Sequence, residues 1–427
     1  MTNMSSSHLK AQTSISPSSV PPSDFLPDSG NLFPKWPHQI DKGTVEVWLF
    51  DGIAADASSA VTVSFYRDVL TAPAGFRVAI NANWADGTKW GGHPVFAESV
   101  VTSEGPDIAN GRVVGVWQSI SADGGGGSSS SRASFEVAAD LSTARVSFDV
   151  PGKVTGTIVL TTSSAFQHLP KTAEEAKMSP EAYWMRPIAM AGVTAHLTFT
   201  TENPEGTPSE KLLRLDADQG SFGGMDRAWS PLSWAKLISD SWFLRARAGP
   251  YLVQAMRLID RPERGHALHA TARLYHNGKL ECAAQRAIRA GEGDAEGGGG
   301  TADAAGASGG AGGVPDVVVI VEKLFDESSD LSRSTGREQG GGGGVTGAFR
   351  DKNVGYRIEF RTGIAGQQQR RWAFESRHRR GWWNTPTGPP GPNATGLSGF
   401  VDTFVGGVIG SAERFEGVGI AGQGDMP

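Results

Sequence analysis

The 427-residue sequence has little of the material that many functional sites require. It contains a single cysteine, Cys282, which excludes an intramolecular disulfide and a cysteine-based zinc site. We expect this thiol to be a small core side chain, with a catalytic nucleophile as the alternative. One cysteine also fits a reducing compartment, so we predict a cytoplasmic protein.

Long apolar runs and an excess of positive charge are missing too. No run approaches the roughly 18 apolar residues of a membrane span, so we expect no stable membrane insertion. With 39 basic against 45 acidic residues, the formal net charge of -6 provides no basic surface for a phosphate backbone. We therefore expect no nucleic acid partner.

Common catalytic and cofactor motifs are also missing. The sequence has no GxSxG elbow, no HExxH and no dinucleotide fingerprint, and its glycine-rich tracts lack the GK[ST] ending of a phosphate loop. His266 and His269, with His276 beyond them, suggest a metal site, but positions 266 and 269 would point to opposite faces of a strand. We interpret them as solvated or hydrogen-bonded histidines, and we predict no metal and no cofactor.

What the sequence does contain is a series of short runs rich in Val, Phe, Thr and Trp. Alternation in residues 61–65 and 145–150 is the period-two pattern of half-buried strands. No strongly periodic long helix separates these runs, which argues against a βαβ architecture. We predict an all-β fold, with strands at residues 44–50, 61–66, 76–81, 95–101, 112–120, 153–161, 193–200, 242–247, 252–259, 267–276, 317–325, 356–362 and 371–377.

The length exceeds what one hydrophobic core usually supports, so we expect two domains. A turn-forming stretch at 230–234, followed by a short helical piece, marks the boundary. We predict a disordered Ser- and Pro-rich leader at 1–33, a β-sandwich at 34–237 and a small closed β-barrel at 238–427. Glycine-rich tracts near 124–131, 291–313 and 340–344 are predicted to be flexible loop insertions.

Tryptophan is abundant, with 12 residues. Indole rings provide rigid apolar walls and one N–H donor, which suits a pocket for an extended apolar ligand, although core packing is the alternative for each ring. Seven of them lie in or beside the proposed boundary and second domain: Trp184, Trp229, Trp234, Trp242, Trp372, Trp382 and Trp383.

Four stretches together resemble the fungal lipocalin-like Diels-Alderases. They are VWLFD at 47–51, GGMDRAWSPLSW at 223–234 running into SWFLRARAGPY at 241–251, GGVIG at 406–410 and GVG at 417–419. A wider group of lipocalin-like domains, including carotenoid hydratases, carries a related glycine-rich turn with Asp and Trp.

The resemblance implies an N-terminal β-sandwich packed on a C-terminal lipocalin-like β-barrel, with a pocket at their junction. It implies a cofactor-free cyclase of fungal secondary metabolism. Such an enzyme folds a linear polyene polyketide or polyketide–amino acid hybrid and sets the stereochemistry of a [4+2] ring closure that forms a decalin or the isoindolone of a cytochalasan. The partners are then the apolar linear substrate and a polyketide synthase pathway.

The resemblance also implies site residues. The catalytic candidates, all polar and all from the first domain, are Asp51, Tyr66, Asn81 and Asn83. The substrate-binding candidates are the aromatic residues Trp234, Phe243, Trp229, Tyr183, Trp184 and Trp382. A cationic donor is expected from the barrel, either Arg245 or Arg247.

Alternatives to these assignments stay open at the level of sequence. Asn81 and Asn83 precede a turn that they would also stabilise, and Asp51 before Gly52 is also a typical turn acid. The competing functions are a non-catalytic carrier of an apolar intermediate and a carotenoid-hydratase-like enzyme, which needs a general acid near an alkene.

Overall fold

The computed structural model describes residues 3–69, 75–119, 130–202, 206–284, 286–288, 316–326, 349–363 and 370–427. The chain divides into two compact units, Met1–Leu237 and Ile238–Pro427. Within the described ranges no helix is long and apolar enough to cross a membrane. The predicted loops at 291–313 and 340–344 and most of 124–131 lie outside the described residues, whereas Ser131 begins a strand.

The described part of the first unit consists mainly of β-strands, with two α-helices of four residues each. The helices are α1 (Ala173–Ala176) and α2 (Trp234–Leu237). The strands are β1 (Asn3–Lys10), β2 (Val45–Ile53), β3 (Ser59–Arg67), β4 (Phe76–Trp84), β5 (Lys89–Gly92), β6 (Val95–Phe96), β7 (Glu98–Gly105), β8 (Arg112–Ser119), β9 (Ser131–Val137), β10 (Thr143–Val150), β11 (Val154–Thr161), β12 (Lys177–Ser179), β13 (Ala182–Glu202), β14 (Pro208–Leu215) and β15 (Phe222–Ser230).

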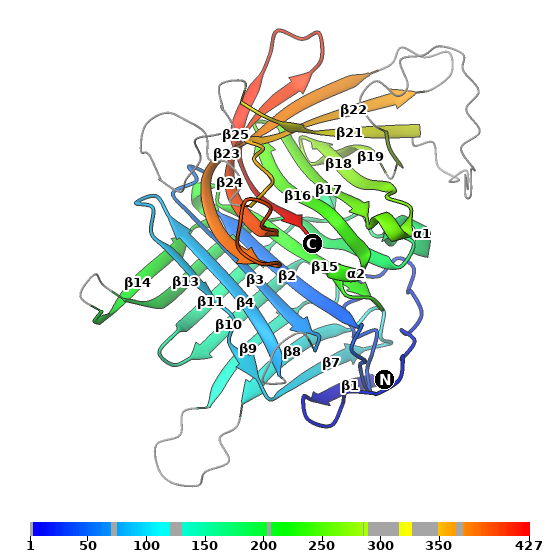
Figure 1. The fold of residues 1–427 in the computed structure, drawn as a ribbon, viewed down its shortest axis with the longest axis vertical. Coiled ribbons are helices and arrows are strands. Elements are labelled where there is room, and N and C mark those ends of the chain that lie inside the picture. The colour runs from blue at the N-terminus through cyan, green and yellow to red at the C-terminus, as the bar shows by residue number, and fades with distance from the viewer. Residues whose placement is uncertain are drawn as a thin grey trace. The chain divides into compact units, whose positions relative to one another are not determined.

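These strands form one continuous sheet that folds back on itself. Its main order is β1-β7-β8-β9-β10-β11-β13-β15-β2-β3-β4-β5, and Figure 1 shows β2, β3 and β4 lying across the layer that contains β8 to β11. Aromatic rings fill the space between the layers: Trp48 of β2 meets Trp117 of β8 at 5.6 Å, and Phe65 of β3 meets Phe135 of β9 at 5.2 Å. The predicted β-sandwich is confirmed.

The prediction of a disordered leader at 1–33 is wrong for the residues that the structure describes. β1 pairs with β7 along its whole length, and the guanidinium of Arg67 donates to both the hydroxyl and the carbonyl of Ser7. The Trp36 and Trp48 indoles donate to the Val20 and Leu32 carbonyls at 2.7 and 2.8 Å. The polar N-terminal segment is therefore held in place by hydrogen bonds to residues that are distant in the sequence.

A group of buried charged side chains also connects the N-terminal segment to the sheet. Arg227 and Glu46 form an ion pair with both side chains fully buried, and Glu46 also accepts from the Lys35 backbone N–H at 2.6 Å. The Lys35 ammonium donates to the Asp24 carbonyl and to Asn31 Oδ1 at 2.6 and 2.7 Å. Burial, reinforced by the charge of Arg227, lowers the pKa of Lys35 to about 8.

The second unit has ten strands in one sheet of order β19-β18-β17-β16-β25-β24-β23-β22-β21-β20. Because β19 and β21 also lie in contact, the sheet curls into a nearly closed barrel, which confirms the predicted architecture. The strands are β16 (Ile238–Ala248), β17 (Tyr251–Asp260), β18 (Leu268–His276), β19 (Lys279–Ala284), β20 (Arg286–Ala287), β21 (Asp316–Leu324), β22 (Gly355–Gly363), β23 (Arg371–Pro386), β24 (Gly396–Val408) and β25 (Phe415–Asp425).

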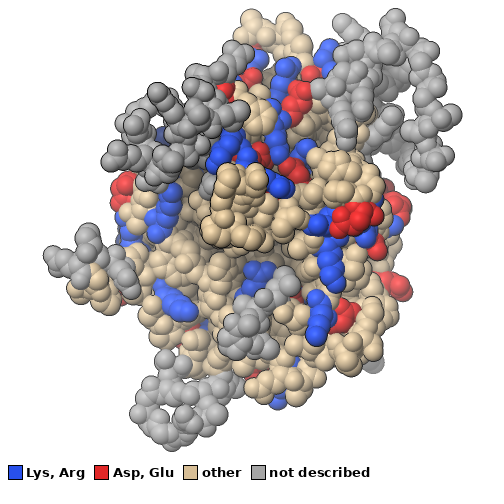
Figure 2. Space-filling model, viewed as in Figure 1, with Lys and Arg blue, Asp and Glu red and all other residues tan. Residues whose placement is uncertain are grey.

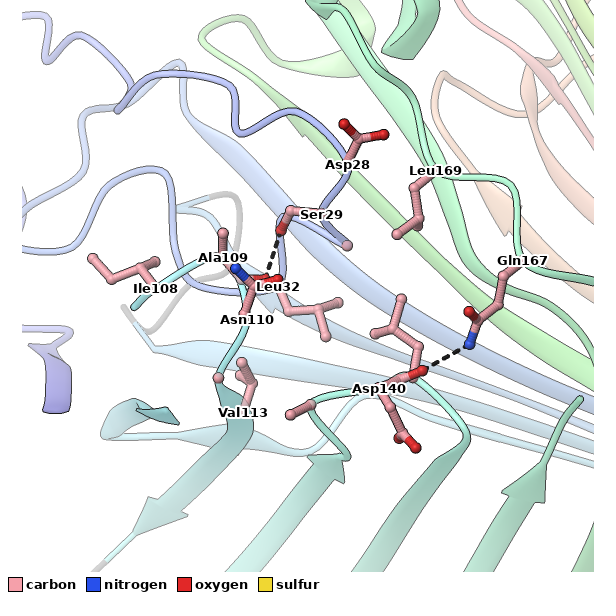
Figure 3. Close-up of a pocket in the computed structure, with 14 residues that line it drawn as sticks. Asp28, Ser29, Leu32, Ile108, Ala109, Asn110, Val113, Asp140, Gln167 and Leu169 are labelled. Carbon is pink, nitrogen blue, oxygen red and sulfur yellow. Dashed lines mark hydrogen bonds between the residues drawn. The ribbon is translucent and has the colours of Figure 1, made fainter. Parts of the chain in front are cut away.

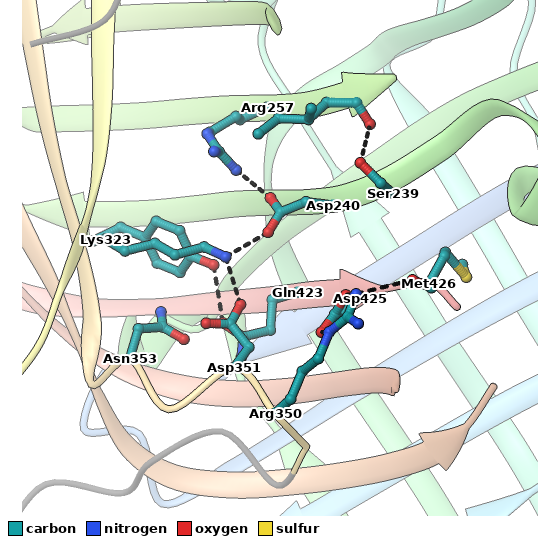
Figure 4. Close-up of polar contacts among 12 residues, drawn as sticks. Ser239, Asp240, Arg257, Lys323, Arg350, Asp351, Asn353, Gln423, Asp425 and Met426 are labelled. Atoms are coloured by element: carbon teal, nitrogen blue, oxygen red, sulfur yellow. Dashed lines mark hydrogen bonds and ion pairs between the residues drawn. The ribbon is translucent and has the colours of Figure 1, made fainter. Parts of the chain in front are cut away.

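Charged side chains gather at one end of this barrel, beside the stacked rings of Trp242 and Tyr356. Asp240 is paired with both Arg257 and Lys323, and the Lys323 ammonium also contacts Asp351 at 2.6 Å (Figure 4). Burial raises the pKa of Asp351. Each of these charged side chains has an opposite charge beside it, so the charges of the group balance.

The surface charges are mixed. On the face drawn in Figure 2, Lys and Arg side chains are interspersed with Asp and Glu. This distribution agrees with the acidic balance of the sequence and provides no long basic track on that face.

Candidate functional site

Strands β15, β2, β3 and β4 bury both of their faces, and the two faces differ in chemistry. One face carries apolar side chains such as Phe50, Val63 and Ile80, which belong to the main core. Side chains alternate between the faces of a strand, so the intervening residues form a second face. That second face is also buried, and many of its side chains are polar, which is unusual for a sheet interior.

A row of polar side chains crosses the second face. Asp51 on β2 lies opposite Thr62 on β3, which lies opposite Asn81 on β4, so the three share one face. Asn83 lies two residues further along the same face of β4 and is fully buried, while Asp51 and Asn81 are 2% and 8% exposed. Three of the four predicted catalytic residues are therefore brought together.

The backbone of β15 holds Asp51 in place. The Gly224 N–H donates to Asp51 Oδ1 at 3.0 Å. At the neighbouring Gly223, a Cβ atom would come within 2.0 Å of the Asp51 carbonyl oxygen. The two glycines of the GGMD stretch thus let β15 approach the backbone of β2 closely and orient the carboxylate.

Tyr66, the fourth predicted catalytic residue, lies on the same face at the other end of β3. It is opposite Val47 and borders a small apolar cluster. The Arg77 guanidinium lies 3.7 Å from the centre of its ring, and Asp68 holds that guanidinium at 2.8 Å. Burial disfavours the charge of Arg77, but Tyr66 and Asp68 outweigh it and raise the pKa of Arg77. The Tyr66 ring is thus held in place by a cation–π contact with Arg77.

The apolar cluster beside Tyr66 contains two of the predicted binding aromatics. Trp184 lies opposite Ala228, and its ring meets that of Trp234 at 6.3 Å. The Trp184 indole N–H donates to Asp226 Oδ2 at 3.0 Å. Asp226 is opposite Leu49, so it belongs to the same face as Asp51.

Asp226 is a further candidate on this face that the sequence prediction did not include. It lies inside the GGMDRAWSPLSW stretch. Its spacing of two residues from Gly224 and from Ala228 is the feature of the sequence that could have identified it. Since residues 224, 226 and 228 of a strand share one face, an acid at 226 is placed toward the polar row once β15 is known to be a strand.

Trp229 and Tyr183 are on the opposite face. Their rings stack at 4.7 Å with an angle of 6°, and Arg227 and Lys35 lie within 5.3 Å of the Trp229 ring centre. Trp229 is 2% exposed and belongs to the main core. The structure therefore does not bring these two predicted binding residues together with the polar row.

The remaining predicted residues are in the second unit. Phe243, Arg245 and Arg247 alternate with the core residues Trp242, Leu244 and Ala246 on β16, so they face away from the barrel core. Arg245 is buried and Arg247 is exposed. Trp382 on β23 is 3% exposed and contacts Trp383 edge to face at 5.2 Å. That the ligand pocket lies at the domain junction stays a prediction.

The histidines have ordinary partners. His269 contacts Asp260 at 2.9 Å, and His276 stacks on Tyr251. His266 precedes β18 at a φ of 53°, so the assumption that it lies on the strand is wrong. Within the described ranges, no three His, Cys, Asp or Glu side chains are grouped closely enough to hold a metal ion. Cys282 is buried in the barrel core, where burial raises its thiol pKa to about 12, so the core assignment is confirmed.

A separate pocket of about 240 Å³ opens between the N-terminal segment and three turns of the first unit (Figure 3). Ser29 Oγ donates to the Ala109 carbonyl at 3.0 Å, and Gln167 Nε2 donates to the Asp140 carbonyl at 2.7 Å. None of the predicted site residues lines it. Two of its lining side chains thus bond to carbonyl groups of the lining itself.

Comparison with known proteins gives consistent matches along the chain. A family model described as Diels-Alderase-like matches residues 1–427. The chain is 43% identical over 409 residues to the Diels-Alderase cghA of Chaetomium globosum, covering 95% of this chain and 74% of that protein. It is 36% identical over 432 residues to the Diels-Alderase fsa2 of Fusarium heterosporum, covering 100% of both. The crystal structure of CghA matches with a TM-score of 0.83 at 42% identity, covering 99% of this chain and 98% of that one.

Proposed function

The chain belongs to the Diels-Alderase-like family, and from that premise we propose that it closes a ring in a linear, polyketide-derived polyene by an intramolecular [4+2] cycloaddition. In this reaction the ends of a diene form two carbon–carbon bonds to a dienophile of the same molecule. Three π bonds become two σ bonds and one π bond, and no atom leaves. A polyketide synthase supplies the substrate.

The first contribution to catalysis is orientation. A concerted cycloaddition needs no nucleophile, so holding diene and dienophile in a near-attack conformer lowers the barrier directly. The rigid rings of Trp184, Trp234 and Tyr66 line one end of the polar face and provide apolar walls for a folded polyene. The same walls select one folding of the chain, and with it one stereochemical outcome.

The second contribution is polarisation of the dienophile. A hydrogen bond to its conjugated carbonyl withdraws electron density, and this bond strengthens in the transition state. The Asn81 and Asn83 amides and the Tyr66 hydroxyl are donors on this face that can bond to that carbonyl, whereas the Asp51 carboxyl oxygens can accept from a substrate N–H or O–H. The observation that carries this assignment is the buried polar row Asp51, Thr62 and Asn81.

The test is cyclisation of the linear precursor by the purified protein. The expected result is a faster reaction and a diastereomer ratio different from that of the spontaneous reaction. Tight binding with an unchanged rate and ratio would instead indicate a carrier. Incorporation of oxygen from labelled water into the product would indicate a hydratase.

A further inference from the structure

A cationic side chain lies at one end of the polar face of β2, β3 and β4. Arg77 is four residues before Asn81 on β4, so both side chains project from the same face of that strand. Phe65 of β3 pairs with Val78 of β4, and Tyr66 and Arg77 are the next residues in this antiparallel register. The side chains of Tyr66 and Arg77 are therefore neighbours on one face of the sheet.

The Arg77 guanidinium is fixed between the ring of Tyr66 and the carboxylate of Asp68. It lies 3.7 Å from the centre of the Tyr66 ring. Its Nη2 and Nε atoms donate to Asp68 Oδ2 at 2.8 and 3.3 Å. The Asp68 side chain is fully buried, and 21% of the Arg77 side chain is exposed. Two donors on one carboxylate restrict the orientation of the guanidinium, so the cation stays over the ring.

The hydroxyl group of Tyr66 is available to a ligand. Among the residues that the structure describes, none forms a hydrogen bond with this hydroxyl. The main chain of Tyr66 is held in place, because its carbonyl accepts from the Trp117 indole at 3.0 Å. The side chain is half-buried, so a fixed phenol ring presents an O–H group that can donate to a substrate carbonyl.

The charge of Arg77 acts on the same phenol. A cation over an aromatic ring favours negative charge on that ring. Burial disfavours the charge of Arg77, but Tyr66 and Asp68 raise the pKa of Arg77. The interaction with Tyr66 is mutual, so the guanidinium stabilises negative charge that the phenol oxygen gains when it donates to a carbonyl becoming more negative in the transition state.

We propose that Arg77 is a positioning residue of the cyclase, which acts through the Tyr66 ring and strengthens the hydrogen bond from the Tyr66 hydroxyl to the carbonyl of the dienophile. In this role Arg77 does not touch the substrate. The inference rests on the proposed function and deepens it, because it makes Tyr66 a stronger donor than the neutral amides of Asn81 and Asn83.

The experiment is a double-mutant cycle with a synthetic linear trienone, 1,7,9-decatrien-3-one, as the probe. Its enone is the dienophile, and it closes to a bicyclic octalone without loss of an atom. Arg77→Met combined with Asp68→Asn removes the cation without leaving a buried carboxylate unpaired. This neutral pair should lower kcat roughly fivefold with KM nearly unchanged, because the strengthened hydrogen bond acts mainly in the transition state.

Tyr66→Phe provides the background that separates this role from a structural one. Without the hydroxyl there is no hydrogen bond to strengthen, so the neutral pair should not lower the rate of Tyr66→Phe further. A role in holding the ring would lower the rate in both backgrounds, because the ring is still present. Arg77→Lys keeps a cation near the ring and should recover part of the loss.

Arg112→Met is the matched control, because Arg112 forms ion pairs at the surface of the same unit. It should keep wild-type kinetics. Thermal unfolding checks that each variant is folded. If the neutral pair does not fold, Arg77→Lys in the wild-type and Tyr66→Phe backgrounds supplies the same comparison with a smaller expected loss.

Three results would overturn the role of Arg77 and leave the proposed function intact. They are equal losses of rate in the two backgrounds, a higher KM with an unchanged kcat, and wild-type kinetics in the neutral pair. A wild type that does not speed closure of the trienone is a different result, because it contradicts the proposed function together with the inference that rests on it.

Discussion

The two buried faces of β15, β2, β3 and β4 are made by alternate residues of the same strands, yet they differ in chemistry. On the core face Trp48 packs against Trp117 and Phe135, and its N–H donates to a carbonyl. On the other face the side chains of Asp51, Thr62 and Asn81 lie opposite one another on β2, β3 and β4. Burial of apolar surface stabilises the first face, whereas burial of polar groups gains little stability.

We propose that stability and reactivity are assigned to separate sides of one sheet. A polar row in a buried sheet is tolerated because each strand already gains its burial energy from the core face. The polar row can then present hydrogen-bonding groups on a rigid surface. Groups held in this way need not change their orientation during the reaction. Substitutions on the two faces should therefore be separable by experiment.

The largest effect on stability is expected on the core face. Trp48→Ala should lower the free energy of unfolding by about 3–5 kcal/mol, because it creates a cavity among aromatic rings and leaves the Leu32 carbonyl without its donor. Urea denaturation measures this loss. Thr62→Val on the polar face is the matched control and should cost less than about 1.5 kcal/mol, because it removes one hydroxyl group and leaves no cavity. Similar losses for both variants would remove the distinction between the faces.

The largest effect on reactivity is expected on the polar face. Asp51→Ala and Asn83→Ala should slow cyclisation more than they weaken ligand binding, because a hydrogen bond to the reacting system acts mainly in the transition state. The cost should be at most about 3 kcal/mol for each. Single-turnover rates and binding titrations supply the two numbers, with the exposed Asn110→Ala as the control.

Two outcomes would count against this assignment. Equal losses of rate and affinity would make Asp51 and Asn83 simple ligand contacts. Wild-type rates in both variants would remove them from the mechanism.

A smaller, pH-dependent effect is expected where the N-terminal segment covers the core face. The pKa of Lys35 is lowered to about 8 in the folded protein, so between pH 8 and its ordinary pKa the unfolded chain binds more protons. The contribution of Lys35 to stability should therefore increase as the pH rises through this window. We expect a gain of about 1–2 kcal/mol between pH 8 and 9.5.

Urea denaturation of wild type and Lys35→Met at several pH values isolates this contribution. The wild type should gain stability relative to the variant as the pH rises. A difference that does not change with pH would show that Lys35 is not held at a lowered pKa.

The smallest effect is expected from the glycine-rich tract that the sequence predicts to be a flexible loop insertion. Replacing residues 291–313 with a short turn should leave folding and activity nearly unchanged, because lengthening or shortening a flexible loop changes only its closure entropy. Soluble expression and the cyclisation rate are the measurements. Loss of soluble expression would mean that the tract is part of the fold.

The sequence predicted most strands with alternating or β-branched patterns, but it missed those that depend on distant partners. β25 is rich in glycine, which disfavours a strand on its own. In the structure, a Cβ at Gly422 would lie within 2.2 Å of the Phe243 ring, so the absence of a side chain is what allows the packing. β1 was missed for a related reason, since it is held by pairing with β7 and by a hydrogen bond from Arg67 to Ser7, about 60 residues away.

The site was predicted only in part, because the sequence shows which residues are polar but does not show the register in which the strands pair. Asp51, Asn81 and Asn83 were identified as polar groups, but their common row follows from pairings of β2, β3 and β4 that one sequence does not specify. The same limitation explains Trp229, which lies one residue from Ala228 and therefore on the opposite face.

A structure of the protein with its cyclised product bound tests the central claim most directly. The account predicts a product carbonyl or other polar group within about 2.6–3.2 Å of a polar atom of Asp51, Tyr66, Asn81 or Asn83. A product held wholly inside the barrel, with all four residues beyond hydrogen-bonding reach, would contradict it.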